Sequence, residues 1–205
     1  MSTGDIALID YGAGNLASVR KAFVAAGASL STPERPSDLE RAAGIVVPGV
    51  GHFGATRSLD AQWRSAITQR IADGCPLFGI CLGMQWLFDG STEAPDVPGL
   101  GVLTGTCARL DDHGGALKIP HVGWNALDVA PDSHLLDGVA AGAYVYFTHS
   151  YAAPVTDAAV ATTSHGTRFA AAVERGRIMG VQFHPEKSSD AGLRMIRNFV
   201  ALCGA

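Results

Sequence analysis

The sequence predicts an α/β protein in three layers, with a largely parallel central sheet, helices on both faces and added antiparallel strands in the C-terminal half. In the first half, short apolar runs alternate with segments of helical periodicity, and this β-α-β-α-β-α order is typical of a parallel sheet. In the second half, strand-like runs follow one another with short connections, which favours antiparallel pairing. The length of 205 residues suits one domain of this kind.

The N-terminal elements are indicated by apolar spacing and by residues that begin or end helices. Residues 5–10 form the first expected strand, and the glycine-rich segment after it ends the strand. Asn15 is a suitable N-cap for the helix that follows, and Gly27 is a suitable stop for it. Ser37, with Glu40 three residues later, predicts a capping box and a short helix. The apolar face of the first helix consists of Leu16, Val19, Ala22, Phe23 and Ala26, and a second strand is expected at 28–31.

Two further strand–helix pairs complete the parallel part of the predicted sheet. Residues 45–47 are a short buried strand, and residues 59–71 carry an apolar stripe at helical spacing. Residues 76–80 are another apolar run, and helical character continues from 84 to 88. Ligand sites in such sheets lie at the carboxyl ends of the strands, so the segments that follow these strands are expected to meet on one rim.

The second half of the chain is expected to hold six strands and a final helix. Ser189 begins this helix, which has an apolar face of Leu193, Ile196, Phe199 and Val200. The strands are expected at residues 104–110, 124–129, 144–148, 160–164, 168–173 and 178–183.

Composition excludes several classes of function. The formal net charge is −4 and the pI is near 5.9, with no cluster of lysine and arginine, which argues against a nucleic-acid partner. The four cysteines form no CxxC pair and no zinc spacing, so we interpret them as free thiols in a reducing compartment. No secretory leader and no bilayer-spanning apolar run is visible, so we expect a cytoplasmic protein without membrane contact.

Cys81 stands where an apolar strand meets a helix, in the run PLFGICLGMQ. Gly79 and Gly83 flank it, as a tight strand-to-helix turn requires, because a Cβ there would clash with nearby backbone. The arrangement matches the nucleophile elbow of GxSxG enzymes, with cysteine in place of serine. A helix N-terminus directs its free N–H groups at the sulfur, which favours the nucleophilic thiolate. A buried, unreactive thiol is the alternative interpretation.

His184 is the expected base for this thiol. It follows the strand predicted at 178–183, and Glu186 lies two residues further on, which in an extended chain places both side chains on one side. Pro185 biases His184 toward the extended conformation. A cysteine, a histidine and a carboxylate are the nucleophile, the general base and the orienting group of a triad. A structural histidine at a strand end is the alternative, since the chain has seven histidines.

The loop after the strand at 45–47 reads PGVG and supplies glycines where an acyl-transfer site needs backbone donors. Gly49 and Gly51 allow N–H groups to turn toward a ligand, and the N–H of Leu82 would be a second donor to an oxyanion. A plain turn is the alternative. A phosphate-binding P-loop is disfavoured, because the lysine and hydroxyl residue of that motif are missing.

Together, the runs GICLGMQ, PGVG and QFHPE resemble the class I (triad) glutamine amidotransferases, which hydrolyse the side-chain amide of glutamine and pass ammonia to a synthase. The runs IDYGAGNLASV, KIPHVGWN, YFTHSY and HPEKS are similar to the glutaminase subunit of imidazole glycerol-phosphate synthase, in histidine biosynthesis. The matching runs extend from the first strand to the last. The resemblance therefore implies that residues 1–205 are a single glutamine amidotransferase domain, with neither a cofactor nor a metal.

The resemblance implies a role for each matching residue. Hydrolysis would proceed through a cysteinyl thioester, with Cys81 as nucleophile, His184 as base and then acid, and Glu186 as the orienting carboxylate. The backbone of Gly49, Val50, Gly51 and Leu82 would build the oxyanion hole, after a peptide reorientation that depends on the partner. L-Glutamine would be held by Gln85, Glu93, His149, Ser150 and Tyr151.

The resemblance also implies a partner, a cyclase subunit that uses the ammonia to make imidazole glycerol phosphate and aminoimidazole carboxamide ribotide. The interface would include Asn15, Trp124, Tyr146 and Lys187. Three alternatives stay open at this stage. The chain could serve a different synthase, it could be a catalytically silent regulatory subunit, or it could be a cysteine peptidase on a similar sheet.

Overall fold

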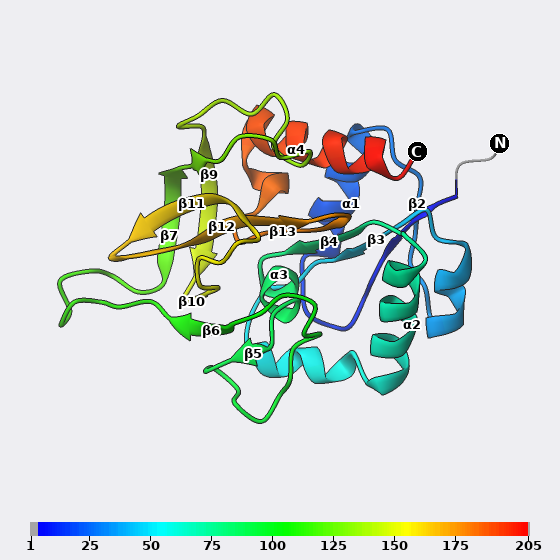
Figure 1. The fold of residues 1–205 in the computed structure, drawn as a ribbon, viewed down its shortest axis with the longest axis horizontal. Helices are drawn as coiled ribbons and strands as arrows, with labels where there is room; N and C mark the ends of the chain where they lie inside the picture. The colour runs from blue at the N-terminus through cyan, green and yellow to red at the C-terminus, as the bar shows by residue number, and fades with distance from the viewer. Residues whose placement is uncertain (1–3, 205) are drawn as a thin grey trace.

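The computed structural model describes residues 4–204 and confirms the three-layer α/β architecture (Figure 1). Eight strands form the central sheet in the order β2-β1-β3-β4-β13-β12-β11-β8. The first five of these pair in parallel, and the remaining pairs are antiparallel. The strands are β1 (Ile6–Leu8), β2 (Leu30–Ser31), β3 (Gly44–Val47), β4 (Leu77–Ile80), β8 (Asp128–Val129), β11 (Ala159–His165), β12 (Thr167–Arg175) and β13 (Ile178–Val181).

Helices cover both faces of this sheet (Figure 1). The helices α1 (Leu16–Ala25) and α4 (Ser189–Leu202) pack on one face, where Ile6, Leu8 and Phe78 belong to the same core cluster. The helices α2 (Ala61–Ala72) and α3 (Leu82–Trp86) pack on the other face, against Ile45 and Leu77. Both faces of the parallel strands are therefore buried, which explains why their sequences are continuous apolar runs.

The second half differs in detail from the prediction. The expected strand at 124–129 is divided between two sheets, because β7 (His121–Ala126) pairs with β9 (Tyr144–His149) while β8 joins the central sheet. A third sheet, β10-β6-β5, contains β6 (Thr106–Arg109) with β5 (Gly90–Ser91) and β10 (Tyr151–Ala152). The strands β5 and β10 were not predicted, because two residues show no periodicity.

The ends of the helices follow the sequence signals in part. Asn15 caps α1, since its Oδ1 accepts a hydrogen bond from the Ser18 N–H at 3.4 Å, and Gly27 follows the helix with a φ of 95°. The predicted capping box at Ser37 is wrong. The segment η1 (Pro36–Arg41) is a 3-10 helix whose N-cap is Arg35, two residues before Ser37, because Pro36 occupies its first position and the Asp38 carboxylate accepts the backbone N–H of Arg35.

Two more 3-10 segments matter for the site, η2 (Phe53–Ser58) after the PGVG loop and η3 (Pro185–Lys187) after β13. No helix within residues 4–204 is both long enough and apolar enough to cross a bilayer.

Candidate active site

The parallel strands β1, β3, β4 and β13 end at the same edge of the sheet, and the segments that follow them meet there. Cys81 follows β4 directly, and His184 lies a few residues after β13. A cavity of about 320 Å³ opens at this edge, and Cys81 forms part of its wall. Ligands bind at this edge in open parallel sheets, so the cavity is the candidate active site.

Cys81 joins β4 to α3 with a left-handed backbone, at φ 53° and ψ −106°. The turn is crowded, because a Cβ on Gly83 would lie 1.8 Å from the carbonyl oxygen of Val47, and one on Gly79 would lie 2.7 Å from that of Gly83. The predicted elbow and its need for glycine are therefore confirmed. A non-glycine residue in this backbone region is strained, and such strain clusters at functional sites.

His184 and Glu186 form a buried pair, with Nδ1 of the imidazole 2.9 Å from Oε1 of the carboxylate. The pair does not arise from an extended chain, as the sequence suggested. His184 is extended, but Pro185 starts the turn η3, and that turn brings the carboxylate back to the ring. The backbone N–H of His184 also donates to the carbonyl oxygen of Tyr146 at 2.9 Å, which ties the histidine to β9.

The charge state of His184 depends on its two neighbours. Burial disfavours the charged ring, but the Cys81 side chain and the Glu186 carboxylate outweigh burial and raise the pKa of His184 to about 9. Its Nδ1 is engaged by Glu186, and its Nε2 is buried with no hydrogen-bond partner in the described chain. The ring therefore holds a proton at neutral pH and lies close to the thiol of Cys81.

The glycine loop is not arranged as an oxyanion hole in this conformation. The N–H of Leu82, one predicted donor, instead donates to the carbonyl oxygen of Gly49 at 3.3 Å. Gly51 has a φ of 97°, which favours glycine, whereas Gly49 is required for space. A Cβ on Gly49 would lie 2.0 Å from the hydroxyl oxygen of Tyr11. The Leu82 N–H is therefore not free in this conformation.

The cavity wall includes all the residues that the sequence assigned to glutamine binding, Gln85, Glu93, His149, Ser150 and Tyr151. Glu93 accepts the N–H of Phe53 at 2.7 Å through Oε2, so its carboxylate also holds the start of η2. The Gln85 amide donates to the carbonyl oxygen of Tyr151 at 2.8 Å. These bonds fix the two side chains in the cavity wall.

The ring of His149 is fully engaged within the protein. Its Nδ1 donates to the carbonyl oxygen of Tyr151 at 2.9 Å, and its Nε2 lies 3.1 Å from Nδ1 of His121. Burial lowers the pKa of His149 to about 3, so the ring is neutral. A ligand would meet His149 through its backbone rather than its imidazole.

Two polar residues at this site were missed by the sequence analysis as site residues. Gln182 is fully buried, and its Nε2 lies 3.6 Å from the sulfur of Cys81. The sequence did carry a signal for Gln182, because it is a polar residue inside the otherwise apolar run 178–183. Tyr11 is buried beside Gly49, and its hydroxyl has no partner within residues 4–204. Burial and then the nearby Cys81 raise the pKa of Tyr11 above its ordinary value.

Three of the four predicted interface residues lie together. Trp124 and Tyr146 are opposite each other on β7 and β9 with their rings in an edge-to-face arrangement, 6.1 Å between centroids. The ammonium of Lys187 lies 5.8 Å from the centre of the Tyr146 ring. Asn15 is on a different element, at the exposed start of α1.

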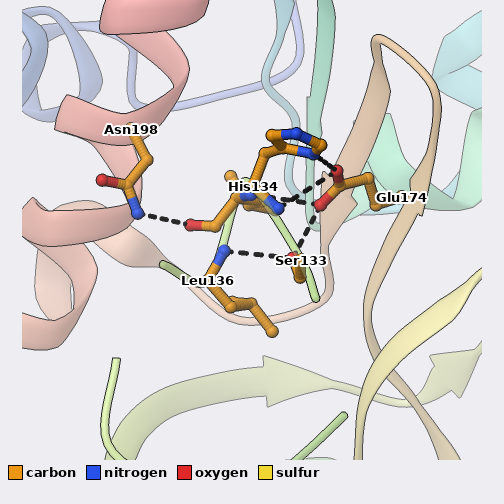
Figure 2. Close-up of polar contacts among 6 residues, drawn as sticks. Ser133, His134, Leu136, Glu174 and Asn198 are labelled. Carbon is orange, nitrogen blue, oxygen red and sulfur yellow. Dashed lines mark hydrogen bonds and ion pairs between the residues drawn. The ribbon is translucent and has the colours of Figure 1, made fainter. Parts of the chain in front are cut away.

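A second cavity, of about 550 Å³, lies between the turn at 132–137 and the end of α4. Its polar groups serve the turn itself. The Glu174 carboxylate accepts hydrogen bonds from Ser133 and His134 (Figure 2). It also accepts the backbone N–H of Leu135, and the Asn198 amide donates to the carbonyl oxygen of Leu135. The hydrogen bonds and burial stabilise a loop, so this cavity offers no comparable chemistry.

A thiol on a strand–helix elbow, beside a buried histidine–carboxylate pair on a mixed sheet, is the arrangement expected of a cysteine enzyme of acyl transfer. A sequence model of the class-I glutamine amidotransferases matches residues 7–203, and the chain belongs to this family. It is therefore a glutamine amidotransferase.

Within the family, the chain is similar over nearly its full length to proteins named imidazole glycerol phosphate synthase subunit HisH. The protein from Natronomonas pharaonis is 46% identical, with 98% of this chain and 96% of that protein covered. The protein from Methanothermobacter thermautotrophicus is 45% identical, with 98% and 100% covered. The protein from Gloeobacter violaceus is 48% identical, with 97% and 89% covered.

Solved structures support the fold. A crystal structure of a glutamine amidotransferase has a TM-score of 0.77 at 21% identity, with 98% of this chain and 100% of that chain covered. The structure of PurLQS from Thermotoga maritima has a TM-score of 0.74 at 16% identity, with 97% of this chain and 98% of that chain covered. At these identities the likeness shows the architecture alone.

Proposed function

We propose that residues 1–205 act as one domain, the glutaminase subunit of an imidazole glycerol-phosphate synthase, and that Cys81, His184 and Glu186 are its triad. The observation that carries the proposal is the elbow thiol on the wall of a cavity, beside a buried imidazole that a carboxylate holds at 2.9 Å. The full-length similarity to HisH proteins supports the choice of synthase in histidine biosynthesis.

The first half-reaction transfers the acyl group of glutamine to sulfur. The Cys81 thiolate attacks the carboxamide carbon, and the carbonyl π electrons move onto oxygen. His184 already carries a proton, because its pKa is about 9, and it gives that proton to the departing nitrogen. The C–N bond breaks, ammonia leaves and a thioester remains on Cys81.

The second half-reaction restores the enzyme. His184, now neutral, accepts a proton from water as the water oxygen attacks the thioester carbon. The C–S bond breaks, glutamate leaves and Cys81 returns as a thiolate beside the protonated ring. Glu186 holds the imidazole in one orientation in both steps, because it bonds Nδ1 and leaves Nε2 available to the sulfur and the substrate.

The glycine loop supports control of the reaction by a partner. The oxyanion of the tetrahedral intermediate needs N–H donors, and in this conformation the Leu82 N–H is bound to Gly49. Rotation of the Gly49–Val50 peptide would free the Leu82 N–H and turn the Val50 N–H toward the cavity. We propose that docking of the cyclase subunit favours this rotation, which limits glutamine hydrolysis to the complex.

An exposed patch beside the triad suits such docking. We call it the ribbon patch, and it consists of Val122, Trp124, Tyr144, Tyr146 and Lys187 on β7, β9 and η3. Val122, Trp124 and Tyr144 are 57%, 51% and 63% exposed, which is unusual for large apolar side chains. Lys187 follows Glu186 directly, so a partner on this patch would also be beside the active site. Ammonia released there could enter the partner before water protonates it.

The test compares glutamate release and cyclase product formation by the complex, with glutamine or with ammonia as nitrogen source. Cys81→Ala should abolish glutamine-dependent product formation and leave ammonia-dependent formation intact, because only the first needs the thioester. Turnover of glutamine by the Cys81→Ala complex would refute the assignment of the nucleophile.

The alternatives predict other results in the same assays. A silent regulatory subunit would release no glutamate even in the complex. A subunit of another synthase would fail to pair with the cyclase in a pull-down. A peptidase would cleave peptides and leave glutamine unchanged.

A further inference from the structure

We infer that Gln182 is a catalytic residue of this site, whose side-chain N–H donates to the sulfur of Cys81 and holds the thiolate in place for attack. The inference rests on the proposed role of Cys81 as nucleophile. It assigns the thiolate a hydrogen-bond donor whose presence does not depend on the protonation state of His184.

The register of two parallel strands brings Gln182 to the elbow. Strands β4 and β13 align Gly79 with Gly180 and Ile80 with Val181, so the next residues along, Cys81 and Gln182, are neighbours. The Cys81 N–H donates to the carbonyl oxygen of Val181 at 2.7 Å, which extends the ladder by one bond. The Gln182 side chain then places Nε2 3.6 Å from the sulfur.

The orientation of the Gln182 amide follows from its other bonds. The carbonyl oxygen of Tyr151 can only accept, so the Gln85 group 2.8 Å from it must be the NH₂ group. The same Gln85 nitrogen lies 3.0 Å from the Gln182 side chain and must meet its oxygen. The other end of the Gln182 amide, its NH₂ group, therefore faces the sulfur. The carbonyl oxygen of Tyr151 therefore fixes which group donates in each hydrogen bond from Gln85 to Gln182 and from Gln182 to Cys81.

Burial separates this role from substrate binding. Gln182 has no exposed surface and lies outside the lining of the 320 Å³ cavity, so glutamine does not touch it. A thiol sulfur is a weak acceptor, whereas a thiolate forms a stronger, charge-assisted bond. The N–H of an amide does not titrate. It therefore favours the ionised sulfur at the two points of the cycle where the sulfur carries charge, before it attacks the carboxamide carbon and as the C–S bond of the thioester breaks.

The test measures the rate at which iodoacetamide modifies Cys81 in the full chain, as a function of pH, by peptide mass spectrometry. Gln182→Met keeps the length of the side chain and removes the donor. We expect the midpoint of the rate profile to move up by about one to two pH units, the worth of one charge-assisted hydrogen bond. In the complex, kcat for glutamine should fall while ammonia-dependent turnover stays unchanged.

Two further variants make the test decisive. Thr163→Val removes another buried hydrogen bond, from the Thr163 hydroxyl to the carbonyl oxygen of Ala126 at 2.8 Å, and should leave the alkylation profile unchanged. Gln182→Glu keeps the acceptor for Gln85 but presents a carboxylate to the sulfur, so its profile should also move to higher pH. If Gln182→Met does not fold, Gln182→Glu replaces it in the alkylation test.

Coincident profiles for the wild type and a folded Gln182 variant would overturn the inference. An equal shift in Thr163→Val would overturn it too, because a general loss of packing would then explain the effect. Alkylation does not require glutamine turnover. The inference can thus fail while the triad assignment holds, because the triad assignment is tested separately by glutamine turnover in the wild-type and Cys81→Ala complexes.

Discussion

Replacing Cys81 by alanine should lower the pKa of His184, and the size of the change follows from the structure. The folded ring has a pKa of about 9, against 6.5 for a free histidine, although burial alone acts in the opposite direction. Burial of His149, which has no carboxylate partner, takes its pKa to about 3. The Cys81 side chain is the leading cause of the increase at His184, with Glu186 second.

Removing the sulfur leaves burial opposed by Glu186 alone. We expect the pKa of His184 to fall from about 9 to near or below its ordinary value of 6.5, a change on the order of 3 kcal/mol in the interaction of the ring with the Cys81 side chain. The ring would then change from largely protonated to largely neutral at a pH between about 7 and 9. The change is an electrostatic effect on one ring, so the fold and the other histidines should be unaffected.

The measurement is an NMR titration of the histidine ring carbons, with the His184 signal assigned from a His184→Gln variant. Ser188→Ala is not a suitable control, because the Ser188 hydroxyl bonds the His184 carbonyl oxygen at 2.6 Å. Thr163→Val, remote from the ring in the hydrogen-bond network, is suitable. A His184 pKa that stays near 9 in Cys81→Ala would refute the electrostatic coupling of nucleophile and base.

Four more outcomes follow from the structure. Gly83→Ala should destabilise the chain by at least about 1–3 kcal/mol and disturb the elbow, because its Cβ would lie 1.8 Å from a carbonyl oxygen. Thermal unfolding measures the effect, and Gly90→Ala is the control, because the atom nearest to its added Cβ would be 3.4 Å away. Tyr11→Phe should unfold at the same temperature or a higher one, because the lost hydroxyl is buried and unbonded among residues 4–204; a clear decrease would show a hidden partner. Glu174→Gln should destabilise the chain by about 1.5–3 kcal/mol at neutral pH, because hydrogen bonds outweigh burial and lower the pKa of Glu174 below 4.5. This stabilisation is present above pH 4.5 and is lost as the pH falls through the pKa of the folded state, so the denaturant unfolding curves of the two proteins should converge in acid. Lys187→Ala should weaken stimulation by the cyclase and leave the unfolding temperature unchanged; unaltered stimulation would remove this residue from the interface.

Local signals predicted the parts of the fold whose neighbours are close in sequence. The elbow at Cys81 was predictable because the two glycines that relieve its crowding are two residues away on each side. The pair of His184 and Glu186 was predictable for the same reason, although the chain forms it by a turn rather than by extension. Signals failed where an element was very short, as at β5 and β10, or where a single predicted strand serves two sheets, as at β7 and β8.

The amino-acid order alone determined the layered α/β class, the elbow, the identity of the triad candidates and, through the motifs, the family. Tertiary structure alone decided the state of the site. The bond from Leu82 to Gly49 and the contact of Gln182 with Cys81 join residues 33 and 101 positions apart. Such contacts are set by strand register and close packing, which depend on the whole fold rather than on spacing along the chain.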